Sequence, residues 1–393
     1  MEKPKIRFLK NKHSWVRNTF EEIAKRRTKS SDNPDLPRIE YQDIISGEGR
    51  LNKDLNKNID CRKGIVFETN DILYGKLRPY LKNWLHPNFN GIALGDFWVL
   101  QARNCDSKFL FSLVQSPKFQ RVANDTSGTK MPRSDWKTVS QTEFSIPTSN
   151  EEQSAIGKLF RTLDDLLASY KDNLANYQSL KATMLSKMFP KAGQTVPEIC
   201  LDGFEGEWQK YYLGDIFEQV SNYIEPSVEN ELWSLTVEKG LTPKTDRYKR
   251  DFLVKKNDKF KKVNLNEFVY NPMNLTLGAL DLNNNEVTIS VSGYYIVIKN
   301  RDIEKFDNDF LKILLKTMYA IYQYKQFATG SLIEKQRVQF PTFSEIPFYL
   351  PPIAEQRSIG SYFSNLNNLI NSHKEKISQL ETLKKKLLQD MFI

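Results

Sequence analysis

One long helical pattern occurs twice in this chain, at residues 152–189 and again at residues 355–392. A single offset of 203 aligns the two copies without a gap, and fourteen positions are identical. The identical pairs are Glu152/Glu355, Gln153/Gln356, Ile156/Ile359, Gly157/Gly360, Phe160/Phe363, Leu163/Leu366, Leu166/Leu369, Ser169/Ser372, Lys171/Lys374, Leu180/Leu383, Lys181/Lys384, Leu185/Leu388, Met188/Met391 and Phe189/Phe392. A repeat that keeps its spacing over this length indicates one structural unit present in two copies.

Apolar residues in both copies recur at alternating steps of four and three, the heptad pattern of helices that pack side by side. At a rise of ~1.5 Å per residue, each helix would reach roughly 57 Å. His373 and the repeated pair Lys181 and Lys384 interrupt the apolar stripe, and we interpret them as points where partner helices or solvent meet the pair. We expect the two helices to pack together and to provide the interface to other subunits through the seam residues Ile156, Phe160, Leu163, Leu167, Tyr170, Leu174, Tyr177, Ile359, Phe363, Leu366, Ile370, His373, Ile377 and Leu380.

The opening segments of the two halves also match. With an offset of 193, the residues Pro4, Ile6, Trp15, Phe20 and Ile23 fall on Pro197, Ile199, Trp208, Leu213 and Ile216. Between the matching ends the halves differ almost completely, which indicates two variable domains, each followed by a helix of fixed pattern. The predicted organisation is a first domain at 1–145, a spacer helix at 146–190, a linker at 191–206, a second domain at 207–349 and a second spacer helix at 350–393.

Each half mixes strands and helices, so the predicted fold class is α+β, with two mixed α/β domains in a pseudo-twofold repeat. The first half has strand patterns at 64–67, 71–74 and 92–100 and a helical pattern at 108–122. The second half has strand patterns at 268–270 and 287–298 and a helical pattern at 309–324. A Gly-containing turn then follows in each half, at 127–128 and at 329–330, and a strand that ends in proline precedes the long helix.

The composition favours a polyanionic partner. The formal net charge is +9 and the pI is near 9.1. Three cysteines without paired spacing argue against a disulfide framework and a zinc site, and they indicate a reducing compartment. The N-terminus lacks the apolar core of a signal peptide, and no segment approaches the ~18–20 apolar residues of a membrane span. We therefore expect a cytoplasmic protein with no membrane partner.

The common motifs of catalysis are absent from the sequence. It contains no GxxxxGKS/T phosphate loop, no CxxC pair, no HExxH and no GxSxG. The sequence AsnProMetAsn at 271–274 is the nearest approach to an amino-methyltransferase loop, but it lacks the second proline and the aromatic residue of such loops. The three histidines are scattered and do not favour a His-based metal or acid–base centre. The chain is therefore expected to bind rather than react, with no cofactor or metal of its own.

Basic stretches interleaved with aromatic and amide residues are the candidate binding sites. In the first half, residues 74–82 place cations around a turn after a strand, where they could meet phosphates or guanine edges. In the second half, residues 244–262 would supply a salt-sensitive grip, and the amides at 271 and 274 suit adenine. A solvated charged loop is the competing interpretation of each basic stretch. The candidates are Tyr74, Lys76, Arg78, Lys82, Lys130, Arg133, Lys244, Arg247, Lys249, Arg250, Lys255, Asn271 and Asn274.

These repeated residues carry a resemblance to a known family. The pattern GluGln…IleGly…Phe…Leu ending in Leu…MetPhe, with the turns at 74–79 and 270–273, resembles the specificity subunit of type I restriction-modification systems over essentially the whole chain. The resemblance implies two target recognition domains that each read one half of a bipartite site in double-stranded DNA. It also implies two long antiparallel helices, coiled-coil-like, that separate the domains, set the gap and dock two methyltransferase subunits.

The resemblance further implies that this chain is not itself an enzyme. Partner subunits would supply adenine methylation with S-adenosylmethionine, and a restriction subunit would supply translocation and cleavage with ATP and Mg. The chief alternative is a duplicated coiled-coil adaptor that bridges proteins without binding DNA. A third possibility, a self-sufficient methyltransferase or nuclease, requires cofactor binding by this chain alone. Selective DNA binding that weakens with rising salt separates the specificity subunit from the adaptor.

Overall fold

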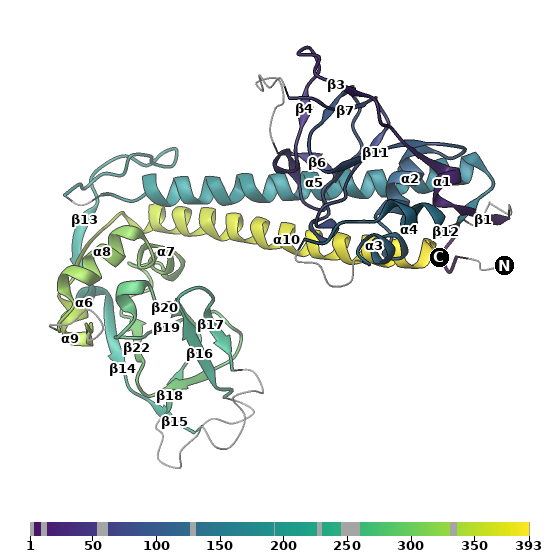
Figure 1. The fold of residues 1–393 in the computed structure, drawn as a ribbon. Coiled ribbons are helices and arrows are strands. Elements are labelled where there is room, and N and C mark those ends of the chain that lie inside the picture. Colours follow the sequence, from purple (N-terminus) through teal and green to yellow (C-terminus); the bar gives the residue numbers. More distant parts are fainter. Residues whose placement is uncertain are drawn as a thin grey trace. The chain divides into compact units, whose positions relative to one another are not determined.

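The computed structural model has an α+β fold and describes residues 4–8, 14–52, 62–125, 131–191, 193–225, 230–244, 260–330 and 336–392 (Figure 1). The chain forms two compact units. The first comprises residues 1–174 and 372–393, and the second comprises residues 175–371. Each unit therefore consists of one mixed domain together with part of each long helix.

The first unit is built on two four-stranded sheets, with the strand orders β2-β11-β8-β9 and β3-β7-β10-β4. The pair β1-β12 joins the start of the domain to the strand before the long helix, and β5-β6 forms a hairpin. The strands are β1 (Trp15–Thr19), β2 (Ala24–Arg26), β3 (Ser30–Ser31), β4 (Arg38–Ile39), β5 (Ile44–Ile45), β6 (Arg50–Leu51), β7 (Gly64–Phe67), β8 (Ile72–Gly75), β9 (Trp84–Leu85), β10 (Gly91–Ala93), β11 (Phe97–Ala102) and β12 (Glu143–Pro147). The helices are α1 (Phe20–Ile23), α2 (Ser107–Val114), α3 (Pro117–Ala123), α4 (Trp136–Gln141) and the long α5 (Asn150–Lys187).

The second unit has a four-stranded sheet of order β14-β22-β19-β20 and a three-stranded sheet of order β15-β18-β21. The pairs β13-β23 and β16-β17 complete it. The strands are β13 (Gln209–Tyr212), β14 (Phe217–Val220), β15 (Tyr223–Ile224), β16 (Trp233–Thr236), β17 (Gly240–Pro243), β18 (Phe260–Val263), β19 (Glu267–Tyr270), β20 (Leu280–Leu282), β21 (Ile289–Ser292), β22 (Ile296–Asn300) and β23 (Pro347–Leu350). The helices are α6 (Leu213–Ile216), α7 (Asn308–Leu314), α8 (Met318–Phe327), α9 (Phe340–Ser344) and the long α10 (Ile353–Met391).

The two units repeat one plan although their sequences diverge. The order β2-β11-β8-β9 corresponds to β14-β22-β19-β20, and the pair β1-β12 corresponds to β13-β23. Among the described residues, four short α-helices precede the long one in each unit, in the order α1 to α4 and α6 to α9. The predicted α+β class and the pseudo-twofold repeat are confirmed, and the repeat extends through the domains as well as the helices.

Two predicted strands are wrong as single elements. The segment 92–100 is divided between β10 and β11, which belong to different sheets, because the chain turns at Gly95 with a φ of +87°. Glycine adopts this left-handed conformation without a steric penalty, so the turn costs little free energy there. The segment 287–298 is likewise divided between β21 and β22. The strand predicted at 64–67 is confirmed as β7, and those at 71–74 and 268–270 correspond to β8 and β19.

Two predicted helices are also wrong as single elements. The helix predicted at 108–122 is α2 followed by α3, and the helix predicted at 309–324 is α7 followed by α8. At both breaks a hydroxyl residue caps the second helix: Ser116 Oγ accepts from the Phe119 N–H, and Thr317 Oγ1 accepts from the Ala320 N–H. Side chains of this type compete for backbone donors and start a new helix.

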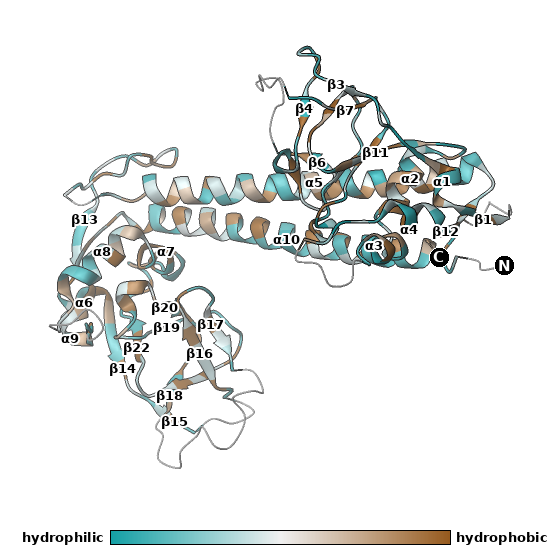
Figure 2. Ribbon diagram, in the orientation of Figure 1, coloured by the Kyte–Doolittle hydropathy of each residue, from teal (hydrophilic) through white to brown (hydrophobic). Residues whose placement is uncertain are grey.

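The long helices agree with the repeated helical patterns at 152–189 and 355–392 within two residues at each end. Both carry mainly hydrophilic residues with hydrophobic residues between them (Figure 2). Ile156, Phe160 and Leu163 belong to the core of the first unit, and Ile359 and Phe363 to the core of the second. The remaining seam residues are buried or half-buried, with Leu167, Leu366 and Ile370 buried and Tyr170, Leu174, Tyr177, His373, Ile377 and Leu380 half-buried.

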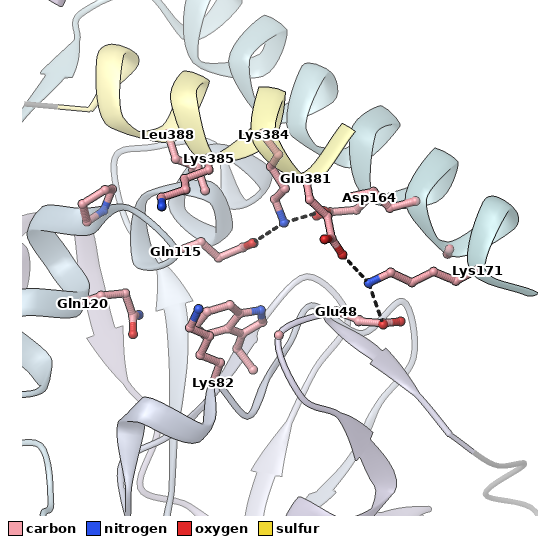
Figure 3. Close-up of a pocket in the computed structure, with 15 residues that line it drawn as sticks. Glu48, Lys82, Gln115, Gln120, Asp164, Lys171, Glu381, Lys384, Lys385 and Leu388 are labelled. Carbon is pink, nitrogen blue, oxygen red and sulfur yellow. Dashed lines mark hydrogen bonds and ion pairs between the residues drawn. The ribbon is translucent and has the colours of Figure 1, made fainter. Parts of the chain in front are cut away.

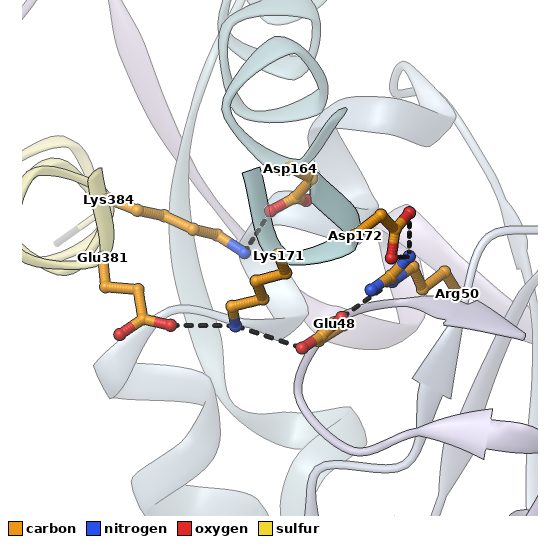
Figure 4. Close-up of polar contacts among 7 residues, drawn as sticks. All are labelled: Glu48, Arg50, Asp164, Lys171, Asp172, Glu381 and Lys384. Atoms are coloured by element: carbon orange, nitrogen blue, oxygen red, sulfur yellow. Dashed lines mark hydrogen bonds and ion pairs between the residues drawn. The ribbon is translucent and has the colours of Figure 1, made fainter. Parts of the chain in front are cut away.

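Within the first unit, α5 and α10 run antiparallel. Asp164 of α5 pairs with Lys384 of α10 at 2.5 Å, and further along α5 Lys171 pairs with Glu381 at 2.9 Å (Figure 4). The ring of His373 contacts that of Tyr170, with centroids 5.3 Å apart. His373 and Lys384 thus make contacts inside the unit while remaining half-buried, and their interpretation as points where partner helices or solvent meet the pair stays a prediction. Lys384 interrupts the apolar stripe because Asp164 provides a counter-ion inside the unit.

A repeated glutamine fastens each long helix to its own domain. The side chain of Gln153 donates to a proline carbonyl just before α5 (2.8 Å) and accepts from the backbone N–H of Asp106 (2.8 Å). Gln356 makes the equivalent pair of bonds before α10, at 2.8 Å to a proline carbonyl and at 2.9 Å from the N–H of Asp307. Asp106 and Asp307 are the N-caps of α2 and α7. Each glutamine thus ties its helix to the same point of its domain.

The repeated glycines allow this close approach. A Cβ atom at Gly157 would lie 2.7 Å from the Cβ of Lys108 and 2.7 Å from the backbone nitrogen of Phe109. A Cβ atom at Gly360 would lie 2.9 Å from Asp307 Oδ1 and 3.1 Å from the backbone nitrogen of Phe310. These distances are shorter than ordinary carbon contacts, so the glycines are required by packing and not by helix conformation.

The repeated MetPhe pairs pack into the domain at the far end of each helix. Phe189, just after α5, lies 5.9 Å from Phe310 and 6.2 Å from Phe363 between ring centroids, in the core of the second unit. Phe392, just after α10, lies 5.4 Å from Phe109 and 5.8 Å from Phe160, in the core of the first unit. Each long helix therefore begins against one core and ends in the other.

We expect Gly157→Ala to lower the free energy of unfolding by about 1–3 kcal/mol, since overpacking outweighs the gain of about 1 kcal/mol that alanine brings to an unconstrained helix site. Gly360→Ala should act in the same direction but less strongly, because its contacts are longer. Chemical denaturation of the full chain measures both. Ser169→Ala, at an exposed position of α5, is the control and should change stability by no more than about 0.5 kcal/mol. Stabilisation by Gly157→Ala would contradict the packing account.

Phe189→Ala should lower the free energy of unfolding of the second unit, and Phe392→Ala that of the first, each by about 3–5 kcal/mol. Each substitution removes an aromatic ring from the core at the far end of its helix. Hydrogen exchange measured by mass spectrometry, unit by unit, detects the difference. Leu383→Ala, on the exposed face of α10, should leave exchange in both cores unchanged. Faster exchange of the first unit's core in Phe189→Ala would mean that the helix ends are assigned to the wrong cores.

Candidate nucleic-acid interface

The hairpin loop between β8 and β9 carries the basic stretch predicted in the first domain. Arg78 and Lys82 adopt the left-handed conformation, at φ +50° and +55°, which residues other than glycine seldom adopt. They flank the 3₁₀ turn η3 (Pro79–Leu81), where the N–H groups of Leu81 and Lys82 donate to the carbonyls of Arg78 and Pro79 at 2.9 Å. Both cationic side chains are exposed. A hydrogen-bonded backbone thus presents two cations at defined points.

A neighbouring segment holds this loop in place. The N–H of Arg78 donates to the carbonyl of Pro132 at 2.7 Å, and the N–H of Ser134 donates to the carbonyl of Lys76 at 2.8 Å. Asp96 pairs with Lys76 at 3.6 Å and with Arg133 at 2.7 Å. The structure therefore brings Lys76, Arg78 and Arg133 together, although they come from two stretches that are separate in the sequence. Lys130 lies outside the described residues.

Tyr74 belongs to the core and not to this surface. Its side chain is 1% exposed, and its ring stacks on Trp98 with centroids 5.8 Å apart. Burial raises the pKa of the Tyr74 phenol well above its usual value. Its hydroxyl accepts a long hydrogen bond of 3.4 Å from Gln120. The tyrosine anchors the strand that leads into the basic loop.

The equivalent loop of the second unit lies between β19 and β20 and carries the two predicted amides. The side-chain oxygen of Asn271 accepts from the N–H of Met273 at 3.0 Å, which shapes the start of the turn. Asn274 is exposed and stands at the N-cap of the 3₁₀ turn η5 (Leu275–Leu277). The N–H of Val338 donates to the carbonyl of Pro272 at 3.0 Å, so a neighbouring segment holds this loop as well.

The basic stretch of the second domain falls largely on residues that the structure does not describe. Arg247, Lys249, Arg250 and Lys255 lie outside the described residues. Lys244 directly follows β17, and its N–H donates to the carbonyl of Leu232 at 3.0 Å. At the other end of the stretch, Lys261 is buried and donates to the carbonyl of Tyr295 at 2.7 Å, so it is not available to a ligand.

Arg337 was missed by the sequence analysis. It is exposed and immediately precedes Val338, as Arg133 precedes Ser134 in the first unit. The signal was present in the sequence, because both arginines follow the Gly-containing turn that each half repeats. Exposed apolar side chains accompany both loops: Tyr80, Leu81 and Met131 in the first unit, and Met273, Leu277 and Met318 in the second. Apolar groups beside polar ones are common where proteins read bases.

A cavity of about 380 Å³ lies in the first unit beside the basic loop (Figure 3). Lys384 bridges Asp164 (2.5 Å) and Gln115 (2.7 Å) on its wall. Burial raises the pKa of Asp164 even though Lys384 lies next to it. At the other wall, Lys171 bridges Glu381 (2.9 Å) and Glu48 (3.1 Å). The three carboxylates of the wall are thus each paired with a lysine, and we interpret these ion pairs as contacts that stabilise the fold.

The second of these bridges continues into the β5-β6 hairpin. Glu48 also pairs with Arg50 at 2.7 Å, and Arg50 pairs with Asp172 of α5 at 2.8 Å (Figure 4). Burial alone would raise the pKa of Glu48, but Arg50 and Lys171 together hold it below its usual value. The network fastens the hairpin to the helix pair inside the first unit.

Within the part of the chain that the structure describes, no group of His, Cys, Asp and Glu side chains could hold a metal ion. Nor does any helix in those residues combine the length and the hydrophobicity that are needed to cross a lipid bilayer.

Comparison with known proteins gives consistent results. Residues 205–382 match the family model for the type I restriction modification DNA specificity domain. The type I restriction enzyme EcoDI specificity subunit of Escherichia coli is 25% identical over 189 residues, which cover 46% of this chain and 42% of that protein. The chain thus spans less than half the length of that relative. The MjaVIII specificity subunit of Methanocaldococcus jannaschii is 23% identical over 354 residues, covering 83% of this chain and 79% of that protein.

A solved structure shares the fold. The crystal structure of a type I restriction-modification S subunit from M. genitalium has a TM-score of 0.64 and 16% identity, and the match covers 100% of this chain and 99% of that one. The family model falls on the second half and its helix, while the MjaVIII match spans most of both halves. Residues 205–382 thus match a type I restriction modification DNA specificity domain, and the chain as a whole is similar to specificity subunits of type I restriction enzymes.

Proposed function

We propose that this protein is the DNA sequence-recognition subunit of a type I restriction-modification complex, in which each unit reads one half of an asymmetric bipartite site. The observation that carries the proposal is one fold used twice, with an exposed and hydrogen-bonded hairpin loop in each copy. The loops differ in their polar side chains, while the helices that follow the domains keep their pattern. Variable loops on a constant fold suit a protein that reads two different half-sites.

In this proposal the two loops and the arginines beside them face the DNA. Arg133 and Arg337 hold the same place in the two units, so we assign them to phosphates, a feature that every sequence shares. The chain itself performs no chemistry. Partner subunits bring S-adenosylmethionine for methylation and ATP with Mg for translocation and cleavage. The complex works in the cytoplasm, where its DNA is found, and the length of the helices sets the gap between half-sites.

Repeated leucines mark the surface where the partners dock. Leu166 and Leu369 are identical in the repeat and are 42% and 44% exposed, and Leu180 and Leu383 are identical and are 40% and 45% exposed. Leu166 and Leu383 belong to the first unit, and Leu180 and Leu369 to the second. Neither unit needs these side chains for its own core. Four exposed leucines, two in each unit, support docking of one methyltransferase subunit on each unit.

Arg133→Ala and Arg337→Ala should each weaken DNA binding for all sequences alike and reduce the slope of log affinity against log salt concentration by about 0.9, because each removes one phosphate contact. Fluorescence anisotropy of the full chain on duplex DNA across a salt series measures the slope. Lys376→Ala, at an exposed cation of α10, is the matched control and should leave the slope unchanged. A wild-type chain that binds no duplex selectively would favour the adaptor instead.

Leu166→Glu combined with Leu383→Glu should reduce the number of bound methyltransferase subunits from two to one, since a charge in an apolar contact is costly. Leu369→Glu with Leu180→Glu should remove the other copy. Native mass spectrometry of the co-expressed complex counts the subunits. Thr162→Glu places a charge at an exposed position of α5 that the repeat does not preserve, and it should leave both copies bound. Retention of two copies by all of these variants would rule out the leucines as the docking surface.

A further inference from the structure

We propose that Arg78 and Asn274 occupy one and the same specificity-determining position in the two units, and that Arg78 selects guanine in one half-site while Asn274 selects adenine in the other. This inference rests on the proposed function and adds to it the chemical character of each half-site.

The two hairpin loops align residue by residue without a gap. Tyr74 faces Trp84 across the first hairpin, and Tyr270 faces Leu280 across the second, at a constant offset of 196. The hydrogen bonds that close the loops keep this offset: the N–H of Gly75 donates to the carbonyl of Asn83 at 2.7 Å, and the N–H of Asn271 donates to that of Ala279 at 3.0 Å. The loops therefore have equal length and equal closure.

The 3₁₀ turns inside the loops keep the same register. Arg78 and Asn274 are the N-caps of η3 and η5, and Lys82 and Gly278 are the C-caps, both in the left-handed region. The N–H of Leu81 donates to the Arg78 carbonyl at 2.9 Å, and the N–H of Leu277 donates to the Asn274 carbonyl at 3.0 Å. The backbone differs at the N-cap itself, since Arg78 has a φ of +50° and Asn274 a φ of −119°. The two loops thus share length and register, and they differ in their N-cap conformation and in the side chains they present.

Those side chains differ in a chemically specific way. The first loop presents Lys76, Arg78 and Lys82, whereas residues 271–279 contain no charged residue. A guanidinium fits the two acceptors that guanine exposes in the major groove, N7 and O6. A carboxamide fits the N7 acceptor and N6 donor of adenine, and apolar side chains such as Met273 and Leu277 suit the methyl group of thymine. Both of these apolar side chains are exposed, at 46% and 57%.

In contrast to Arg78 and Asn274, the residue beside each loop does not differ between the units. Arg133 and Arg337 are the same residue in both units and stand next to the backbone bonds that hold each loop. A residue that is unchanged between two units with different targets suits a feature common to both targets, namely the phosphate backbone. The position that differs between the units, Arg78 in the first and Asn274 in the second, is then the one that suits recognition of the DNA sequence.

The test begins with selection of duplexes from a randomised pool by the full wild-type chain. The enriched motif should be bipartite, with a guanine required in one half and an adenine in the other. Replacing the required guanine by 7-deazaguanine, which lacks the N7 acceptor, should weaken binding about tenfold or more, and 7-deazaadenine should do the same in the other half.

Exchanged side chains then assign each half-site. Arg78→Asn should convert the guanine preference to adenine in one half and leave the other half unchanged, and Asn274→Arg should do the converse. Asparagine tolerates the left-handed backbone that position 78 requires, so the first variant preserves the loop. Arg78→Lys keeps the charge but loses the planar fork, and it should retain affinity while losing selectivity for guanine.

The outcomes separate this inference from the proposed function. If the pool yields a bipartite motif but the three variants leave its base preferences unchanged, the specificity assignment is overturned and the proposed function stands. If Arg78→Asn keeps full selectivity for guanine, Arg78 does not read that base and the assignment is again overturned. If the wild-type chain enriches no motif, both the proposed function and the inference fail.

Discussion

The structure depends on the burial of the two ends of each long helix in two different cores. Helix α5 begins with Ile156 and Phe160 in the first core, and the chain just after its end places Phe189 in the second. Helix α10 begins with Phe363 in the second core and is followed by Phe392 in the first. Burying a large aromatic side chain contributes several kcal/mol, so neither helix can leave its place without opening a core. This explains why the repeat preserves MetPhe at the end of each helix.

The folds of the two units correspond, but the polar contacts that their long helices make are different. In the first unit, Asp164 and Lys171 of α5 form ion pairs with α10 and with the β5-β6 hairpin. In the second unit, the residue equivalent to Asp164 is Asn367, which lines a cavity of about 310 Å³ together with Asn368 and Asn371. The repeat therefore preserves the apolar anchors and lets the polar contacts vary. The hairpin loops follow the same rule, since their length and closing hydrogen bonds are common to both units and their side chains differ.

Much of the fold was predictable from the sequence, because the heptad pattern and the duplication are strong signals. The breaks inside the domains were not, because Gly95, Ser116 and Thr317 change the chain direction within stretches that are apolar on both sides. Periodicity cannot distinguish a long buried strand from two short ones in different sheets. The ion pair of Lys384 was not predictable either, since its counter-ion Asp164 lies far away in the sequence.

The candidate site was predicted in part. The loops at 74–82 and 270–274 stand out as turns, and the structure places Arg78 and Asn274 at equivalent exposed positions in them. Tyr74 could not be distinguished from an exposed aromatic residue by sequence alone, because its burial depends on Trp98 and Phe119 from other elements. Arg337 was missed although it follows the same Gly-containing turn as Arg133, because only the structure shows that the adjoining Val338 donates a hydrogen bond to Pro272 of the loop.

The central claim is that one chain specifies a bipartite DNA site through two different copies of one recognition unit. The most direct measurement is a map of methylated bases across the host genome with this gene present and with it deleted. The account predicts that deletion removes methylation from one asymmetric, interrupted motif and leaves other motifs modified. Persistence of every methylated motif after the deletion would contradict it.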